Sequence, residues 1–180
     1  MVTPREARRR AEALLERSGI LLTPRELRRM EVADYGLGRL ATVGLQIHVY
    51  VNTPRYCAKE LVLLPGQTCP EHRHPPIGRG NPGKQETFRC RWGEVYLHVP
   101  GRGPRRPKAR APGEWFTAAR EVVLRPGEQF TVEPDTLHWF QAGPRGAVVS
   151  EFSSRSVDGR DIFTDPAIRR FPRGRPPGAA

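Results

Sequence analysis

From residue 43 onward, apolar and polar residues alternate in short segments, and this pattern restricts the fold more than any other feature. One face of an extended strand at 43–52 would carry Val43, Leu45, Ile47, Val49 and Val51. Further strands are expected at 57–64, 69–74, 84–90, 94–99, 120–124, 128–133, 137–142 and 147–153. Pro-Gly pairs at 65–66, 82–83 and 126–127 mark turns between them. The sequence therefore predicts a mainly β fold, a closed barrel or a double sheet.

Two helices are expected ahead of the strands. The sequence TPRE occurs at Thr3–Glu6 and at Thr23–Glu26, and each copy fits a capping box with Pro at the first helical position. We expect helices at about 4–17 and 24–34, with Gly19 ending the first. The 180 residues suit one domain at 1–168, with a helical extension at 1–36, a barrel at 43–168 and a basic tail at 169–180.

The net charge of +11 comes mainly from two segments, 101–110 and 169–180. Both are rich in Pro and Gly and lack interleaved aromatic residues that would stack on bases. We interpret them as an exposed loop and a tail, and expect no nucleic-acid partner.

No apolar run approaches the roughly 18 residues of a membrane span, and the N-terminus lacks the apolar core of a signal peptide. The three cysteines are an odd number without CxxC spacing, which indicates a reducing compartment. We therefore expect a cytoplasmic protein with no membrane partner.

The strongest functional signal comes from His72, His74, Glu86 and His138. A His-x-His pair on a strand directs both imidazoles to the same face. Another His and a carboxylate would complete a site for a divalent first-row metal with open positions for chemistry. These ligands suit Mn, Fe, Co, Ni or Zn without choosing among them.

Other candidates near this set are interpreted as structural. His48 and His98 are expected to be ordinary core or surface residues, and Cys69 a small buried residue rather than a soft ligand.

The stretches 66–93 and 127–142 resemble the two motifs of the cupin superfamily. The first motif is matched by Gly66, His72, His74, Glu86 and Gly93, with an inserted loop in the spacer before Glu86. The second runs from Gly127 to His138, with Asp135 at a position that is usually Gly and Ala142 at one that is usually Asn. The resemblance implies a jelly-roll-like cupin β-barrel in which the four positions named above hold the metal.

A longer resemblance covers nearly the whole chain. It is carried by DYGLG at 34–38, VYVNTPRYCAKELVL at 49–63, PGQTCPEHRHPP at 65–76, GKQETFRCRWGEVYLHV at 83–99, HWFQAG at 138–143 and DIFTDP at 161–166. These segments look like those of the small cupin-type D-lyxose isomerases. The resemblance implies interconversion of D-lyxose and D-xylulose, and often of D-mannose and D-fructose, with a divalent ion that is typically Mn²⁺.

Such an isomerisation moves a proton between C1 and C2 through a cis-enediol, so it needs a carboxylate besides the metal ligands. Glu151 in AVVSEF is the candidate, although alternation along that strand leaves its direction open. Glu86 is the rival base and a further candidate for contact with substrate. Lys59 shares a face with Leu61 and Leu63, so an inward Lys59 would assist at the substrate oxygens.

Two further substrate contacts are expected. Asp161 in GRDIFTDP would bind a sugar hydroxyl or cap a turn. One of Trp139 and Phe140, which follow His138, would line the pocket as a wall against the sugar, and we take Phe140 as the candidate.

We therefore expect a metal-dependent isomerase of a free, unphosphorylated sugar, with a homodimer as the default assembly. Two other classes stay open. One is a different cupin enzyme, such as an Fe(II) dioxygenase or a phosphosugar isomerase, and the other is a non-catalytic sugar-binding cupin.

Overall fold

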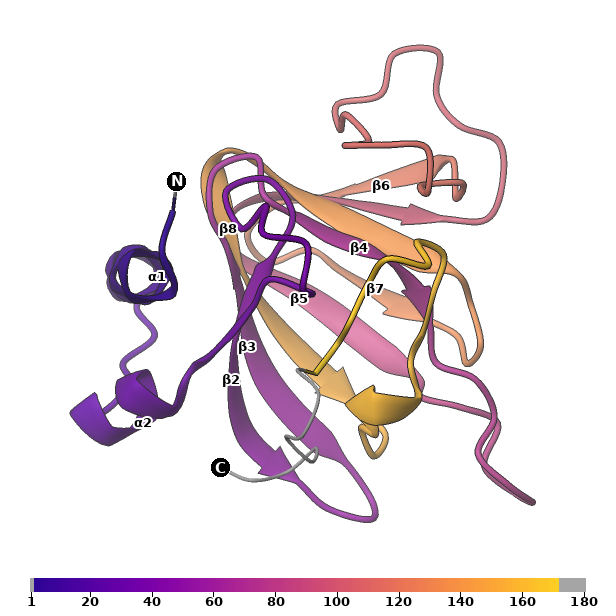
Figure 1. Ribbon diagram of the computed structural model, residues 1–180, viewed down its shortest axis with the longest axis horizontal. Helices are drawn as coiled ribbons and strands as arrows, with labels where there is room; N and C mark the ends of the chain where they lie inside the picture. Colours follow the sequence, from indigo (N-terminus) through magenta and orange to yellow (C-terminus); the bar gives the residue numbers. More distant parts are fainter. Residues whose placement is uncertain (1, 172–180) are drawn as a thin grey trace.

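The computed structural model describes residues 2–171, so most of the tail expected at 169–180 lies outside the described residues. Within that range the strands dominate, and the predicted mainly β fold with two N-terminal helices is confirmed (Figure 1). The elements are α1 (Pro4–Ser18), α2 (Pro24–Arg29), β1 (Glu31–Ala33), β2 (Leu45–Asn52), β3 (Cys57–Leu63), β4 (Thr68–Arg73), β5 (Glu86–Val99), β6 (Arg120–Leu124), β7 (Gln129–Val132), β8 (His138–Ser153), a 3-10 helix (Asp158–Arg160) and β9 (Ile162–Phe163).

Two long strands, β5 and β8, bend in the middle and serve both layers of the curled sheet. The first half of β5 pairs with β7 and its second half with β6. The first half of β8 pairs with β4 and its second half with β3. Because β5 and β8 also pair with each other along their lengths, one layer contains β1, β2, β3 and β7, and the other contains β4, β6 and β9.

The main hydrophobic core lies between these layers. Leu45, Leu61 and Phe88 from one layer belong to the same buried cluster as Leu97 and Phe140 from the other. The polar residues at the end of the barrel lie directly above this apolar cluster.

The two helices lie outside the barrel, on the β2–β3–β8 side (Figure 1). Helix α1 buries Ala11, Leu14 and Leu15 in a second cluster with Val62 and Val148 of the sheet. A complete capping box starts α2, and Gly19 ends α1 with a φ of 74°.

Three sequence expectations need correction. The second helix ends at Arg29 instead of about residue 34, because residues 31–33 pair with β2 as a strand. The segments expected as separate strands at 84–90 and 94–99, and at 137–142 and 147–153, are continuous in β5 and β8. Val49 is 44% exposed although it lies on the face expected to be apolar, and a bulge between Val49 and Val51 interrupts the alternation of β2 beyond it.

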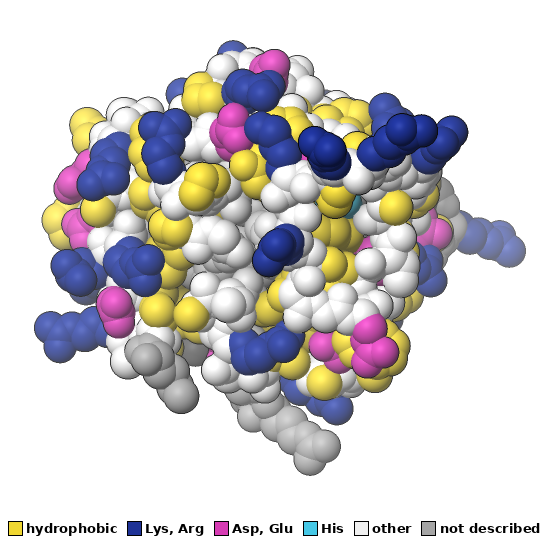
Figure 2. All heavy atoms as spheres, turned by 90° about the horizontal axis from the view of Figure 1, so that it is seen from above, with side chains coloured by type: hydrophobic (Ala, Val, Ile, Leu, Met, Phe, Trp, Pro, Cys, Tyr) yellow, Lys and Arg dark blue, Asp and Glu magenta, His cyan; other side chains and the backbone are white. Residues whose placement is uncertain are grey.

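The basic loop at 101–119 lies beside β6, at the opposite end of the barrel from the β2–β3 hairpin (Figure 1). Glu121 accepts the backbone amides of Lys108 and Ala109, and Gln141 bonds both the amide and the carbonyl of Arg110. On the face shown in Figure 2, Lys and Arg side chains are scattered among apolar and acidic ones. None of the described helices is long and apolar enough to cross a membrane.

The bend of β5 depends on a close backbone approach at Gly93. Its φ is 75°, and a Cβ there would lie 2.0 Å from the carbonyl oxygen of Gly146. We expect Gly93→Ala to lower the free energy of unfolding by about 3 kcal/mol or more. The added Cβ would clash with the backbone carbonyl of Gly146, which cannot move aside as a flexible side chain could.

The matched control is Gly66→Ala. Gly66 has a similar φ of 69°, but nothing lies within 4 Å of a Cβ built there. This variant should lose only the roughly 1–2 kcal/mol cost of a left-handed alanine. Urea denaturation of both metal-free variants measures the difference, and equal losses would refute the steric explanation.

Candidate metal centre

The four predicted metal ligands come together at one end of the barrel. His72 is in β4, His74 follows the end of β4, and Glu86 and His138 are the first residues of β5 and β8. The pairing of β4 with β8 places His72 directly opposite His138. One ligand atom from each of the four residues lies within 4.8 Å of the others, and all four residues are buried.

The hydrogen bonds of His72 and His138 leave one nitrogen of each of these two rings available to a metal. Nδ1 of His72 lies 2.8 Å from the carbonyl oxygen of Pro70, and Nδ1 of His138 lies 2.9 Å from that of Thr136. A carbonyl oxygen only accepts, so both Nδ1 atoms carry the proton and both Nε2 atoms keep their lone pair.

The third imidazole, His74, has a carboxylate as its partner. Its Nδ1 lies 2.6 Å from Oδ1 of Asp161, which is the arrangement that orients many metal-binding histidines. Nε2 of His138 is fully buried, lies 2.8 Å from Glu86 Oε1, and has poor geometry for a hydrogen bond to it. A buried nitrogen without a hydrogen-bond partner costs free energy, so the residues present fit a divalent cation at this point.

Buried charges around Glu86 offset one another. Burial alone would raise the pKa of Glu86, but Lys84 and His74 outweigh it and hold that pKa well below its usual value. Burial and the neighbouring imidazoles lower the pKa of His72. Burial and Lys84 oppose protonation of His74, yet Glu86 and Asp161 raise its pKa to about 9.

Lys84 connects the metal ligands to Glu151. Its Nζ lies 2.6 Å from Glu86 Oε2 and 2.8 Å from Glu151 Oε1. Burial opposes the charge on Lys84, but the two carboxylates raise its pKa well above the usual value. Lys84 is therefore held as a cation between a candidate ligand and a candidate base.

Lys59 lies on the other side of Glu151. Its Nζ lies 4.0 Å from Glu151 Oε1, 2.9 Å from Ser156 Oγ and 3.1 Å from Asp158 Oδ1. Burial would lower the pKa of Lys59, but Glu151 and Asp158 raise it. Lys59, Lys84 and Arg170 together hold the pKa of Asp158 well below its usual range, against the effect of burial.

Residues 154–171 form a C-terminal strap across the open end of the barrel. The strap carries Asp158 and Asp161, and its short strand β9 pairs with β4 so that Phe163 lies opposite His72. Arg170 forms ion pairs with Asp158 and with Glu31 of β1. The strap therefore closes one wall of the site.

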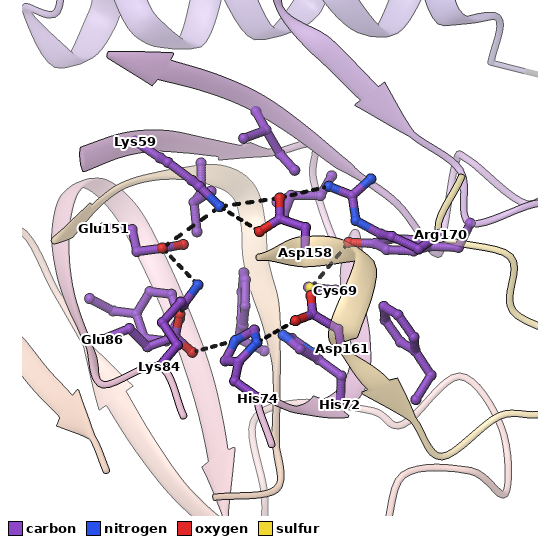
Figure 3. A pocket seen from close by; sticks show the side chains of 17 residues that line it. Lys59, Cys69, His72, His74, Lys84, Glu86, Glu151, Asp158, Asp161 and Arg170 are labelled. Carbon is purple, nitrogen blue, oxygen red and sulfur yellow. Dashed lines mark hydrogen bonds and ion pairs between the residues drawn. The ribbon is translucent and has the colours of Figure 1, made fainter. Parts of the chain in front are cut away.

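These side chains line a cavity with about 400 Å³ of space, including space open to solvent. Figure 3 shows the charged groups of β3, β8 and the strap directed toward the same space as His72 and His74. The floor of the cavity is apolar, with Phe88 and Phe140 among its residues.

The structure brings the other predicted site residues to this cavity. Glu151, Lys59, Asp161 and Phe140 all line it. The alternation of β8 left the direction of Glu151 open, and the structure shows its side chain buried and inward. Asp161 is committed to His74, which is a different contact from the predicted sugar hydroxyl or turn cap.

Residues interpreted as structural lie outside the metal cluster. Trp139 points away from the cavity and stacks on His98 with ring centroids 3.8 Å apart. Tyr35 hydroxyl and Cys69 Sγ lie 3.4 Å apart, and burial raises the pKa of this thiol to about 12. A thiol that keeps its proton is a poor metal ligand, as expected for a small buried residue.

Sequence reasoning missed Lys84, Asp158 and Arg170. Lys84 carried a usable signal, because it lies two residues before Glu86 in extended chain and so shares its face. Asp158 and Arg170 had none, because the strap is irregular and only its docking brings them to the site.

The chain is similar in sequence to several characterised sugar isomerases. It is 61% identical over 171 residues to the D-lyxose ketol-isomerase of Thermofilum sp., covering 93% of this chain and 94% of the relative. It is 58% identical to the D-lyxose/D-mannose isomerase of Thermosediminibacter oceani, with the same coverage. The D-lyxose ketol-isomerase of Cohnella laeviribosi is also 58% identical, over 93% of each chain. No model of a known protein family matches the chain.

Solved structures share the fold at low sequence identity. The L-ribose isomerase of Cellulomonas parahominis, solved with L-ribose, superposes with a TM-score of 0.69 at 17% identity over 93% of this chain and 94% of that one. The L-ribose isomerase of Acinetobacter sp. DL28 in complex with L-ribose gives a TM-score of 0.69 at 18% identity, with the same coverage.

Removal of one imidazole tests the metal centre. We expect His138→Gln to weaken Mn²⁺ binding by more than the roughly 10–100-fold that loss of an outer partner costs, because a ligand itself is lost. The control is His48→Gln, since His48 is also buried but lies outside the four-residue group. Isothermal titration of the metal-free proteins measures both affinities. Wild-type affinity in His138→Gln would exclude this site.

Proposed function

The chain belongs to the D-lyxose isomerase family, and from this membership we propose how its own residues carry out the isomerisation. The protein is a sugar isomerase that interconverts an aldose and a ketose. With D-lyxose as substrate the ketose is D-xylulose, and with D-mannose it is D-fructose. The observation that carries the proposal is the buried Glu151, which lines the same cavity as His72, His74 and Glu86 of the four-residue metal cluster.

We propose that His72, His74, Glu86 and His138 hold a divalent ion, and that the ion is Mn²⁺. Support comes from the two free Nε2 lone pairs and the buried carboxylate described above. When bound, such an ion polarises the oxygens at C1 and C2 and stabilises the negative charge that develops on them.

Glu151 is the proposed base. It removes the proton from C2 of the aldose and returns it to C1, while a proton passes from O2 to O1, so that no atom is gained or lost. A buried carboxylate suits this role because the surrounding side chains hold it close to the reacting carbons and keep water away from it. Its Oε1 has Lys84 at 2.8 Å and Ser153 Oγ at 3.2 Å, and these contacts fix its position.

Lys84 and Lys59 are proposed to act on the substrate oxygens. Both ammonium groups face the cavity and flank Glu151, so they are placed to stabilise charge that develops during proton transfer. Lys84 lies between the base and a metal ligand, which places it nearer to O1 and O2 than Lys59. Phe140 would supply the apolar wall, and Asp161 would act through His74.

The charge pairing favours a substrate without a phosphate group. Each cation that lines the main cavity already has a carboxylate partner: Lys84 has Glu86 and Glu151, while Lys59 and Arg170 share Asp158. None of the residues lining this cavity comes from the basic loop 101–119. A phosphate would have to break an existing buried pair, so a phosphosugar isomerase is less well supported.

We further propose a cytoplasmic homodimer. The three cysteines are free, as suits a reducing compartment. Tyr50 and Phe152 are about half exposed on the outer face of β2 and β8, where an apolar contact with a second copy would cover them.

The assembly can be measured by sedimentation. We expect the wild type to sediment at twice the mass of one chain, and Phe152→Glu to sediment as a monomer, since it places charge in the proposed contact. Ile162→Glu is the control, because Ile162 is also exposed but lies in β9. A monomeric wild type would refute the dimer.

Turnover tests the reaction itself. We expect the protein, stripped with a chelator and reloaded with Mn²⁺, to convert D-lyxose into D-xylulose, and Glu151→Gln to lose at least about 10³-fold in kcat because the base is removed. Glu121→Gln should keep its activity, because the Glu121 side chain is also shielded from solvent but contacts the basic loop and His98, away from the cavity.

Metal binding by Glu151→Gln, measured by titration, separates the two roles. The variant should bind Mn²⁺ with an affinity close to that of the wild type. An active Glu151→Gln would move the base to Glu86, and a wild type that fails with Mn²⁺, Co²⁺ and Ni²⁺ would refute the proposed activity.

A further inference from the structure

Glu71 is a buried carboxylate for which the proposed reaction has no use. It lies in β4 immediately before His72, is 1% exposed, and is directed to the opposite face of the strand from the metal cluster. Burial of a carboxylate is unfavourable unless its oxygens are hydrogen-bonded. Its contacts therefore indicate what the residue does.

Two segments that are remote in sequence meet at this carboxylate. Oε2 accepts the backbone amides of Thr117 and Ala118, both at 2.7 Å. Oε1 accepts the hydroxyl of Thr117 at 3.0 Å and that of Thr164 at 2.8 Å. The carbonyl oxygen of Glu71 also accepts the amide of Thr164 at 3.1 Å. Glu71 thus joins the basic loop and the C-terminal strap to the strand that carries His72.

The strap segment next to Thr164 holds two of the metal-ligand imidazoles. Phe163 lies opposite His72 in the β4–β9 pair, and the two rings are stacked with centroids 5.4 Å apart. Asp161 lies 2.6 Å from Nδ1 of His74. Because β9 has only two residues, its position depends strongly on the contacts at its ends.

We propose that Glu71 is a positioning residue for the metal centre. By holding Thr164, it fixes the register of the strap on β4, and the strap then orients the rings of His72 and His74 through Phe163 and Asp161. The inference rests on the proposed metal site, but it adds a residue that touches neither metal nor substrate. Loss of the contact between Glu71 and Thr164 should weaken metal binding even though all four ligand residues are unchanged.

A purely structural role is the competing explanation. In that case Glu71 would only anchor the loop at 101–119, and its loss would lower stability without a specific effect on the metal. The two threonines distinguish these roles, because both donate to the same oxygen while only Thr164 belongs to the strap.

The test compares Thr164→Val with Thr117→Val, two changes of equal size that each remove one hydroxyl from Glu71 Oε1. We expect Thr164→Val to weaken Mn²⁺ binding to the metal-free protein several-fold, and Thr117→Val to stay within about twofold of the wild type. Glu71→Gln, which replaces one accepting oxygen with a donor, should lose about tenfold or more, in the range of an outer-shell partner. Isothermal titration gives the affinities.

Visible absorption of bound Co²⁺ gives a second readout, since its bands respond to ligand geometry. They should change in Thr164→Val but not in Thr117→Val. If the two threonine variants bind Mn²⁺ equally well and show the same Co²⁺ spectrum, Glu71 is only an anchor, even if Glu71→Gln fails to fold. A wild type that binds Mn²⁺ but does not isomerise D-lyxose would refute the proposed function and leave this inference standing.

Discussion

The site depends on how the buried charge of Glu86 is neutralised. A carboxylate that is 2% exposed is tolerated only with cations beside it, and Glu86 has Lys84 on one side and the imidazoles on the other. Each of those partners then needs its own counter-charge. The result is a chain of alternating charges that runs from the metal cluster to the N-terminal strand through Glu86, Lys84, Glu151, Lys59, Asp158, Arg170 and Glu31.

This chain explains why distant segments meet at one end of the barrel. Its members come from β1, β3, β5, β8, the strap and the extended segment before β5. Removing one member would leave its neighbours buried and unpaired, so the network couples the docking of the strap to the integrity of the site. The fold is held at its closed end by apolar packing and at its open end by paired charges.

Local pattern in the sequence was enough to predict most of the strands, because strands have a period of 2, and it singled out the four candidate ligands. His72 and His74 were identifiable as a pair on one face, and their spacing to Glu86 and His138 resembled known motifs. The pattern failed where tertiary contacts decide. Residues 31–33 were expected to be helical but form a strand by pairing with β2, and the strands expected to end before 93 and 146 continue through both glycines. The strap has no periodic signal, so Asp158 and Arg170 could not be placed.

The same electrostatics bear on which carboxylate acts as the base. A base must accept a proton and give it back, so its charged form should not be too strongly stabilised. Lys84 and His74 hold the pKa of Glu86 well below its usual value, and a bound cation would add to their effect. A carboxylate in that position is a strong ligand and a poor proton acceptor. Glu151 lies outside the ligand group and is held by Lys84 and Ser153. Dividing the two proposed functions between two carboxylates linked by one lysine would let the site bind a metal tightly and still move a proton.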